Sequence, residues 1–114
     1  MDVFSDMTPQ IKLSIVGSKN DNAVFGRGVA SLCHGVREYG SLNKAAKHMN
    51  MAYSKAWRII KTTEEAFDIQ LLDRDGAHGS TLTPEGCHLL DTYEEVEQKS
   101  TVYAAQVLKE CLKS

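Results

Sequence analysis

The chain has 114 residues, of which 42% are hydrophobic and 25% are charged, and its formal net charge is -2 at pH 7. This length suits one compact domain and leaves little room for a separate ligand-sensing effector domain. No apolar run is long enough to cross a bilayer, and residues 1–10 lack the features of a secretory signal, so we expect a cytoplasmic protein.

The strand and helix signals begin near the N-terminus. Residues 11–15 alternate apolar and polar side chains, which predicts a half-buried strand followed by a polar loop over residues 17–22. Residues 27–39 repeat apolar side chains at intervals of three and four, which predicts a helix that Gly40 ends. A single strand needs a partner, and the sequence does not identify one.

A helix-turn-helix is predicted over residues 41–67. Ser41 should cap its first helix, whose small Ala45 and Ala46 would let another helix approach closely. Asn50 suits the tight turn, since asparagine tolerates the left-handed conformation. The next helix should run from about Ala52 to Phe67, with an inner face made by Ala56, Ile59, Ile60, Thr63 and Phe67.

A β-hairpin and a long helix follow. Strand-like segments flank the glycine-bearing loop DGAHG, which predicts a wing over about residues 71–83. Thr83 should cap a helix over about 84–112, with Pro84 at its first position. This helix would be roughly 43 Å long, and its apolar stripe is too long for one small domain to cover. We therefore predict a homodimer that forms through it.

The basic side chains cluster on the predicted helix-turn-helix. Residues 41–63 carry five cations and no Asp or Glu, although the whole chain is slightly acidic. Such a local basic face is typical of a surface that binds a phosphate backbone. The helix starting near residue 52 would enter the major groove of DNA, and the helix starting at residue 42 would cross the backbone. The predicted DNA-binding residues are Lys44, Lys47, Tyr53, Ser54, Lys55, Arg58, Lys61 and Arg74.

The wing and the aromatic side chains leave alternatives open. Arg74, His78 and Ser80 could reach a minor groove or a phosphate, but an ion pair of Arg74 with Asp73 or Asp75 is an equal alternative. Trp57 could stack on a sugar or base, although a partly buried ring that supports the helix is favoured. The lysines could also serve only solubility.

The cysteines and histidines give no clear sign of chemistry. Cys33, Cys87 and Cys111 are odd in number and widely spaced, which argues against a disulfide framework or a zinc ribbon. His34 and His88 each follow a cysteine, but neighbours on a helix point about 100° apart and cannot chelate alone. We expect no metal, no cofactor and no enzymatic activity.

The string AAKHMNMAYSKAWRIIKTTEEAFDIQLLDRDG, followed by LTPEG after the hairpin, resembles the DNA-binding domain of LysR-type transcriptional regulators. The resemblance to the ModE-type, molybdate-responsive branch is closer still. In that branch a strand precedes the first helix, the recognition helix carries a Tyr-x-x-Ala-Trp core and a long helix follows the wing. These features look like Ile11 to Val16, Tyr53 with Ala56 and Trp57, and Pro84 to Leu112.

The resemblance implies a winged helix-turn-helix that dimerises through its terminal helices and binds a palindromic operator, with Ser54, Lys55 and Arg58 on the groove-facing side. Ala52 departs from the usual Ser or Thr cap, and Asn50 replaces the commoner Gly in the turn. The C-terminal oxyanion-binding domains of the family have no counterpart here, so molybdate sensing is not implied.

The predicted fold class is therefore mainly α with a small β component: a single winged helix-turn-helix domain over residues 1–114, with an N-terminal strand and a long C-terminal dimerisation helix. The predicted function is a sequence-specific transcriptional regulator that binds double-stranded DNA as a homodimer, without a membrane or small-molecule partner. The alternative is a dimeric protein-interaction module with little DNA affinity. It is favoured by the acidic residues that border the basic face, namely Glu64, Glu65, Asp68, Asp73 and Asp75.

Overall fold

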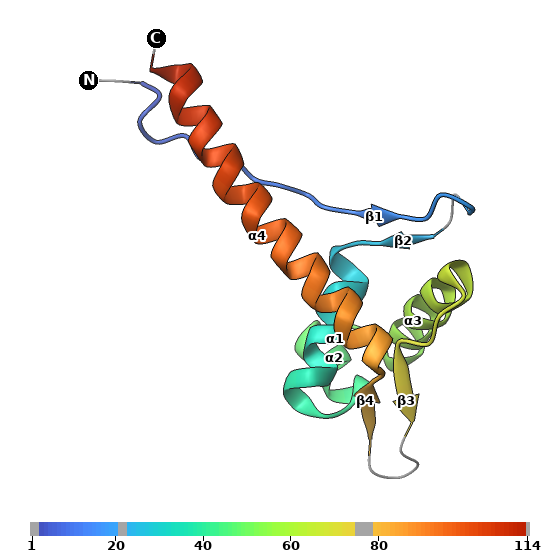
Figure 1. The fold of residues 1–114 in the computed structure, drawn as a ribbon. Helices are drawn as coiled ribbons and strands as arrows, with labels where there is room; N and C mark the ends of the chain where they lie inside the picture. Colours follow the sequence, from blue (N-terminus) through green and yellow to red (C-terminus); the bar gives the residue numbers. More distant parts are fainter. Residues whose placement is uncertain (1–2, 21–22, 75–78, 114) are drawn as a thin grey trace.

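A computed structural model describes residues 3–20, 23–74 and 79–113. A head made by three helices and a β-hairpin carries one long helix that projects from it as an arm (Figure 1). The molecule is accordingly elongated, with principal extents of 59 × 32 × 22 Å. In chain order the elements are β1 (Ile15–Val16), β2 (Val24–Phe25), α1 (Arg27–Tyr39), α2 (Leu42–His48), α3 (Tyr53–Phe67), β3 (Leu72–Arg74), β4 (Ser80–Leu82) and α4 (Pro84–Leu112). The predicted fold class, a mainly α winged helix-turn-helix with a small β component, is confirmed.

Helices α1 and α2 meet at a tight junction. Gly40 ends α1 in the left-handed conformation (φ 81°), and its N–H donates to the carbonyl oxygen of Val36. The Ser41 hydroxyl oxygen then accepts the N–H of Lys44 at 3.1 Å and caps α2, as predicted. The two helices approach so closely that a Cβ added at Gly35 would lie 2.6 Å from the Cβ of Ala45. The prediction that the small side chain of Ala45 allows a close helix contact is therefore confirmed, and the residue opposite it is Gly35.

The turn between α2 and α3 also follows the prediction. Asn50 is left-handed (φ 54°), and the N–H of Met51 donates to the carbonyl oxygen of Ala46 at 2.9 Å. Helix α3 begins at Tyr53, and the side chain of Ala52 makes no capping hydrogen bond. The turn thus fixes the angle between the helices, while α3 starts without the side-chain cap that α2 and α4 have.

The core lies where α1, the inner faces of α2 and α3, and the first turns of α4 meet. The rings of Phe25 and Tyr93 pack edge to face with centroids 5.6 Å apart. The predicted inner face of α3 is confirmed, because Ala56, Ile60 and Thr63 are buried and the remaining two residues are half-buried. Large side chains that are fully buried include Leu32, Leu42, Ile60, Leu71 and Leu90.

The N-terminal strand is shorter than predicted. Within residues 11–16, only Ile15 and Val16 pair as a strand. They form β1, which is antiparallel to β2, with Ile15 opposite Phe25 and Val16 opposite Val24. The partner strand was missed because two residues are too few to show a period, and α1 begins at Arg27 directly afterwards. Residues 11–14 keep the alternating exposure, and the Tyr93 hydroxyl donates to the carbonyl oxygen of Leu13 at 3.2 Å. This segment is therefore extended and held by α4 rather than by a sheet.

The last helix has the predicted bounds, and the two strands of the wing lie within the predicted range of residues 71–83. Strands β3 and β4 pair antiparallel, and α4 covers the 29 residues expected of it. Thr83 caps α4 by accepting the N–H of Gly86 at 2.9 Å. The tip of the wing, including Asp75 and His78, lies outside the described residues. In the part of the chain that is described, we find no helix with the length and apolarity needed to cross a membrane.

Candidate nucleic-acid interface

We call the exposed sides of α2 and α3 together the basic face. It is exposed because the opposite sides of both helices are used by the core, through Ala45 and Ala46 of α2 and Ala56 and Ile60 of α3. All seven DNA-binding residues predicted on these helices are exposed: Lys44, Lys47, Tyr53, Ser54, Lys55, Arg58 and Lys61. Packing alone therefore directs these side chains to solvent.

Among the described residues, the cations of the basic face have no ionic partner. Within residues 3–20, 23–74 and 79–113, the ion pairs involve α1 and α4 and leave out every cation of α2 and α3. Arg37 of α1, by contrast, donates to Asp91 of α4 at 2.8 Å and lies 3.8 Å from Glu94. The positive charge of the basic face is thus available to an external anion.

Two of the acidic residues expected to oppose DNA are engaged within the protein. The Glu64 carboxylate turns to the base of the wing, where it accepts the N–H of Leu71 at 2.7 Å and that of Leu72 at 3.3 Å. Asp73 accepts the side-chain N–H of Gln70 at 3.2 Å. Glu64 lies about 16 Å along α3 from its first residue at 1.5 Å per residue, so its charge is distant from the start of the helix.

Arg74 contacts the aromatic ring of Trp57. Its guanidinium carbon lies 3.9 Å from the centroid of the Trp57 ring, and Tyr53 meets the same ring edge-on at 6.3 Å. The alternative of an ion pair with Asp73 is wrong, because no such pair forms among the described residues, whereas the other alternative partner, Asp75, lies outside them. Trp57 is half-buried, as favoured by the sequence, and its indole nitrogen is buried without a hydrogen-bond partner in the described part of the chain.

The expectation for Ser80 is also wrong. Its side chain is buried and its N–H donates to the carbonyl oxygen of Gly40 at 3.2 Å, so it ties the wing to the junction between α1 and α2. The hydroxyl of Ser80 is therefore not presented to a groove. His78, the third candidate of the wing, lies outside the described residues.

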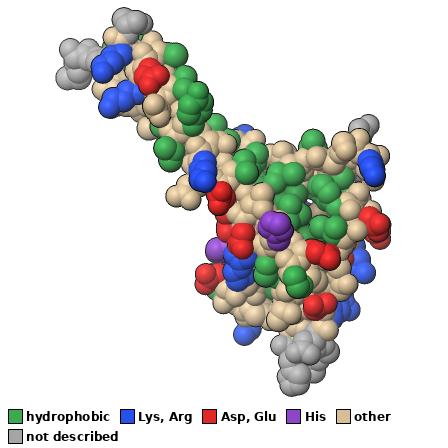
Figure 2. Space-filling view, viewed as in Figure 1, with side chains coloured by type: hydrophobic (Ala, Val, Ile, Leu, Met, Phe, Trp, Pro, Cys, Tyr) green, Lys and Arg blue, Asp and Glu red, His purple; other side chains and the backbone are tan. Residues whose placement is uncertain are grey.

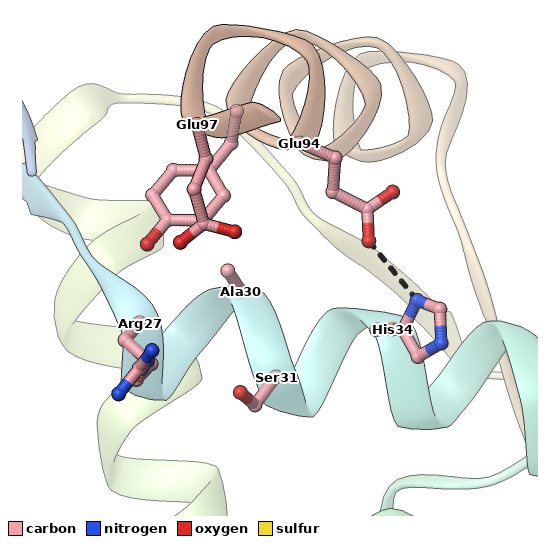
Figure 3. A pocket seen from close by; sticks show the side chains of 7 residues that line it. Arg27, Ala30, Ser31, His34, Glu94 and Glu97 are labelled. Atoms are coloured by element: carbon pink, nitrogen blue, oxygen red, sulfur yellow. Dashed lines mark hydrogen bonds and ion pairs between the residues drawn. The ribbon is translucent and has the colours of Figure 1, made fainter. Parts of the chain in front are cut away.

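A second cluster of charged residues lies between α1 and α4 and was missed in the sequence. His34 of α1 and Glu94 of α4 point toward one another, with Nδ1 and Oε2 3.1 Å apart (Figure 3). They line an open hollow of about 250 Å³ together with Arg27, Ala30, Ser31, Tyr93 and Glu97. No local pattern signals these contacts, because the partners are sixty positions apart. Their evident role is to hold α4 against α1.

Cys33 lies in the core and is not a reactive thiol. Cys33 is buried, and burial raises the pKa of its thiol to about 12, with a smaller contribution from Glu64. A thiol with so high a pKa stays protonated and is a poor nucleophile or metal ligand. Among the described residues, no three His, Cys, Asp or Glu side chains are arranged to hold a metal ion.

Residues 31–87, half of the chain, match the family of bacterial regulatory helix-turn-helix proteins of the lysR type. The chain belongs to this family. The match runs from the middle of α1 through α2, α3 and the wing to the first residues of α4. The helix-turn-helix described above is therefore the DNA-binding unit of a transcription regulator of the LysR type, as the resemblance predicted. The finer similarity to the ModE-type branch stays a prediction, and no curated protein is significantly similar to the chain.

Proposed function

We propose that this LysR-type protein binds a specific duplex DNA sequence as a homodimer and thereby regulates transcription. One observation carries the proposal: the cations of the basic face are exposed and lack partners within the described chain, whereas Arg37 of α1 is paired with Asp91. Unpaired Lys and Arg side chains on a helix-turn-helix are suited to phosphates, whose neutralisation supplies much of the affinity for DNA. As a regulator the protein would act in the cytoplasm, without a cofactor or catalytic chemistry.

The residues of the basic face divide into two roles. Lys44 and Lys47 lie on α2, the helix that crosses the backbone, and would contact phosphates. Tyr53, Ser54, Lys55 and Arg58 lie on the first exposed turns of α3 and would face the major groove. The planar guanidinium of Arg58 can donate two hydrogen bonds to a guanine edge. Lys61 and Arg74 lie farther along and would reach the flanking backbone.

The dimer is proposed from the exposed apolar surface of α4. Val102 and Tyr103 of this helix are apolar side chains that are 63% and 68% exposed. Figure 2 shows hydrophobic side chains along the projecting arm, which consists of α4 and the N-terminal segment. A second copy packed on the arm would cover these side chains and place two heads side by side. Light scattering tests this, and a monomer at tens of micromolar would refute the dimer.

The test of DNA binding is selection from a random duplex pool, followed by titration of variants at several salt concentrations. Arg58→Ala should cost about 1 to 3 kcal/mol on the selected site and relax base preference. Lys44→Ala should weaken binding to all sequences and lower the salt slope by about one ion. Lys99→Ala is the matched control, because this exposed lysine pairs with Glu95 on the arm. If neither Arg58→Ala nor Lys44→Ala changes the affinity for DNA, the basic face is excluded as the DNA-binding surface. If the wild-type protein has no affinity for any duplex, the alternative of a protein-interaction module is favoured.

A further inference from the structure

The first strand of the wing is attached to the recognition helix α3 at its base. The Glu64 carboxylate accepts the N–H groups of Leu71 and Leu72, and the Thr83 N–H donates to the carbonyl oxygen of Leu71 at 2.9 Å. The Thr83 hydroxyl also donates to the carbonyl oxygen of Gln70. These contacts fix the start of β3 relative to α3, and Arg74 lies at the end of the same three-residue strand.

The next contact outward is the stack of Arg74 on Trp57. The guanidinium carbon lies 3.9 Å from the ring centroid, a separation typical of a cation–π contact. Because all five N–H donors of a guanidinium lie in its plane, stacking by the face leaves them free to donate at the edge. Arg74 is exposed, and Asp73 is occupied by Gln70. The cation is thus held in place, and among the described residues no carboxylate pairs with its donors.

The stack borders an open hollow of about 500 Å³ between α3 and β3. Two cations line it, Lys61 from the helix and Arg74 from the wing. The carboxylates of Glu64 and Asp73 line it as well, but each already accepts hydrogen bonds within the protein. The hollow therefore lies between the basic face and the wing.

We propose that Trp57 is a positioning residue, which holds Arg74 of the wing ready to bind a backbone phosphate next to the major groove. This inference rests on the proposed function, and it assigns Trp57 no contact with DNA. A side chain ordered before binding loses less rotamer freedom when DNA arrives, so the stack raises affinity through Arg74 alone. The two substitutions should then be strongly non-additive.

Trp57 is the only tryptophan in the chain, so its fluorescence reports the stack directly in the DNA-free protein. Arg74→Ala should change the emission of Trp57, whereas Lys47→Ala, on α2, should leave it unchanged. Unchanged emission in the Arg74→Ala variant would overturn the proposal. Circular dichroism of each variant verifies that the helices are intact.

Duplex binding then separates positioning from contact. Arg74→Ala should weaken binding to all sequences and lower the salt slope by about one ion. Trp57→Leu should weaken binding roughly three- to tenfold with little change of slope, and Trp57→Phe, which keeps an aromatic face, should recover part of the loss. The double variant of Trp57→Leu with Arg74→Ala should bind no more weakly than Arg74→Ala alone.

The control cycle pairs Trp57→Leu with Lys47→Ala, whose losses should multiply because the two residues are independent. If the losses for Trp57 and Arg74 multiply in the same way while the wild-type protein binds DNA, this inference fails and the proposed function stands. If the wild-type protein binds no duplex at low salt, the proposed function fails and the inference with it.

Discussion

Alanine at Gly35 should destabilise the protein, whereas alanine at Gly28 of the same helix should stabilise it. Both positions lie in α1, where alanine is favoured over glycine by up to about 1 kcal/mol. Nothing lies within 4 Å of a Cβ at Gly28, so that gain is kept. At Gly35 the new Cβ would lie 2.6 Å from the Cβ and 3.1 Å from the Cα of Ala45. Overpacking of this kind costs about 1 to 3 kcal/mol.

The free energies of unfolding of the two variants should therefore differ by about 1 to 3 kcal/mol, since the propensity gain is common to both. Urea unfolding followed by circular dichroism measures this difference, with all samples at one protein concentration because dimerisation shifts apparent stability. Equal stabilities for Gly35→Ala and Gly28→Ala would refute the close approach of α1 to α2. That result would also argue against the position of Lys44, because Lys44 lies on α2 and the contact of Gly35 with Ala45 positions that helix.

Three further predictions concern stability, two from helix capping and one from the burial of Cys33. Ser41→Ala should cost about 1 kcal/mol by removing the cap of α2, and Ala52→Ser should add a similar amount by giving α3 a cap that it lacks, both measured by urea unfolding. Burial raises the pKa of Cys33 to about 12, so the unfolded thiol ionises first and stability should fall as pH rises from about 9 to 12. The free energy of unfolding should fall by at most about 1.4 kcal/mol per pH unit. Unfolding measured across this pH range should show a smaller fall for Cys33→Ala.

The sequence predicts best what neighbouring residues decide. The end of α1 at Gly40 and the turn at Asn50 were predictable because few residue types adopt a positive φ. The bounds of α4 followed from Thr83 and Pro84, whose capping chemistry is local. Strand β2 was missed because its two residues carry no period of their own, and only pairing with β1 makes them a strand.

The sequence predicts poorly the contacts between distant elements. Arg74 is flanked by acidic residues, so its local surroundings suggested an ion pair, but β3 carries its side chain to Trp57 of α3. The pairing of His34 with Glu94 likewise depends on how α4 crosses α1. Which residues are exposed could be read from periodicity; which exposed residues are already partnered required the three-dimensional arrangement.

Both strands of the wing are tied to the helix-turn-helix, and by different elements. Strand β3 is held to α3 through Glu64 and Trp57, whereas β4 is held to the α1–α2 junction by the hydrogen bond from Ser80 to Gly40. A wing attached on both sides cannot swing independently of the recognition helix. In the proposed binding mode, the distance between a groove contact from α3 and a backbone contact from Arg74 would therefore be set before DNA binds. Such a head suits DNA whose local shape matches that fixed spacing, so its selectivity should extend to base pairs flanking those that α3 touches.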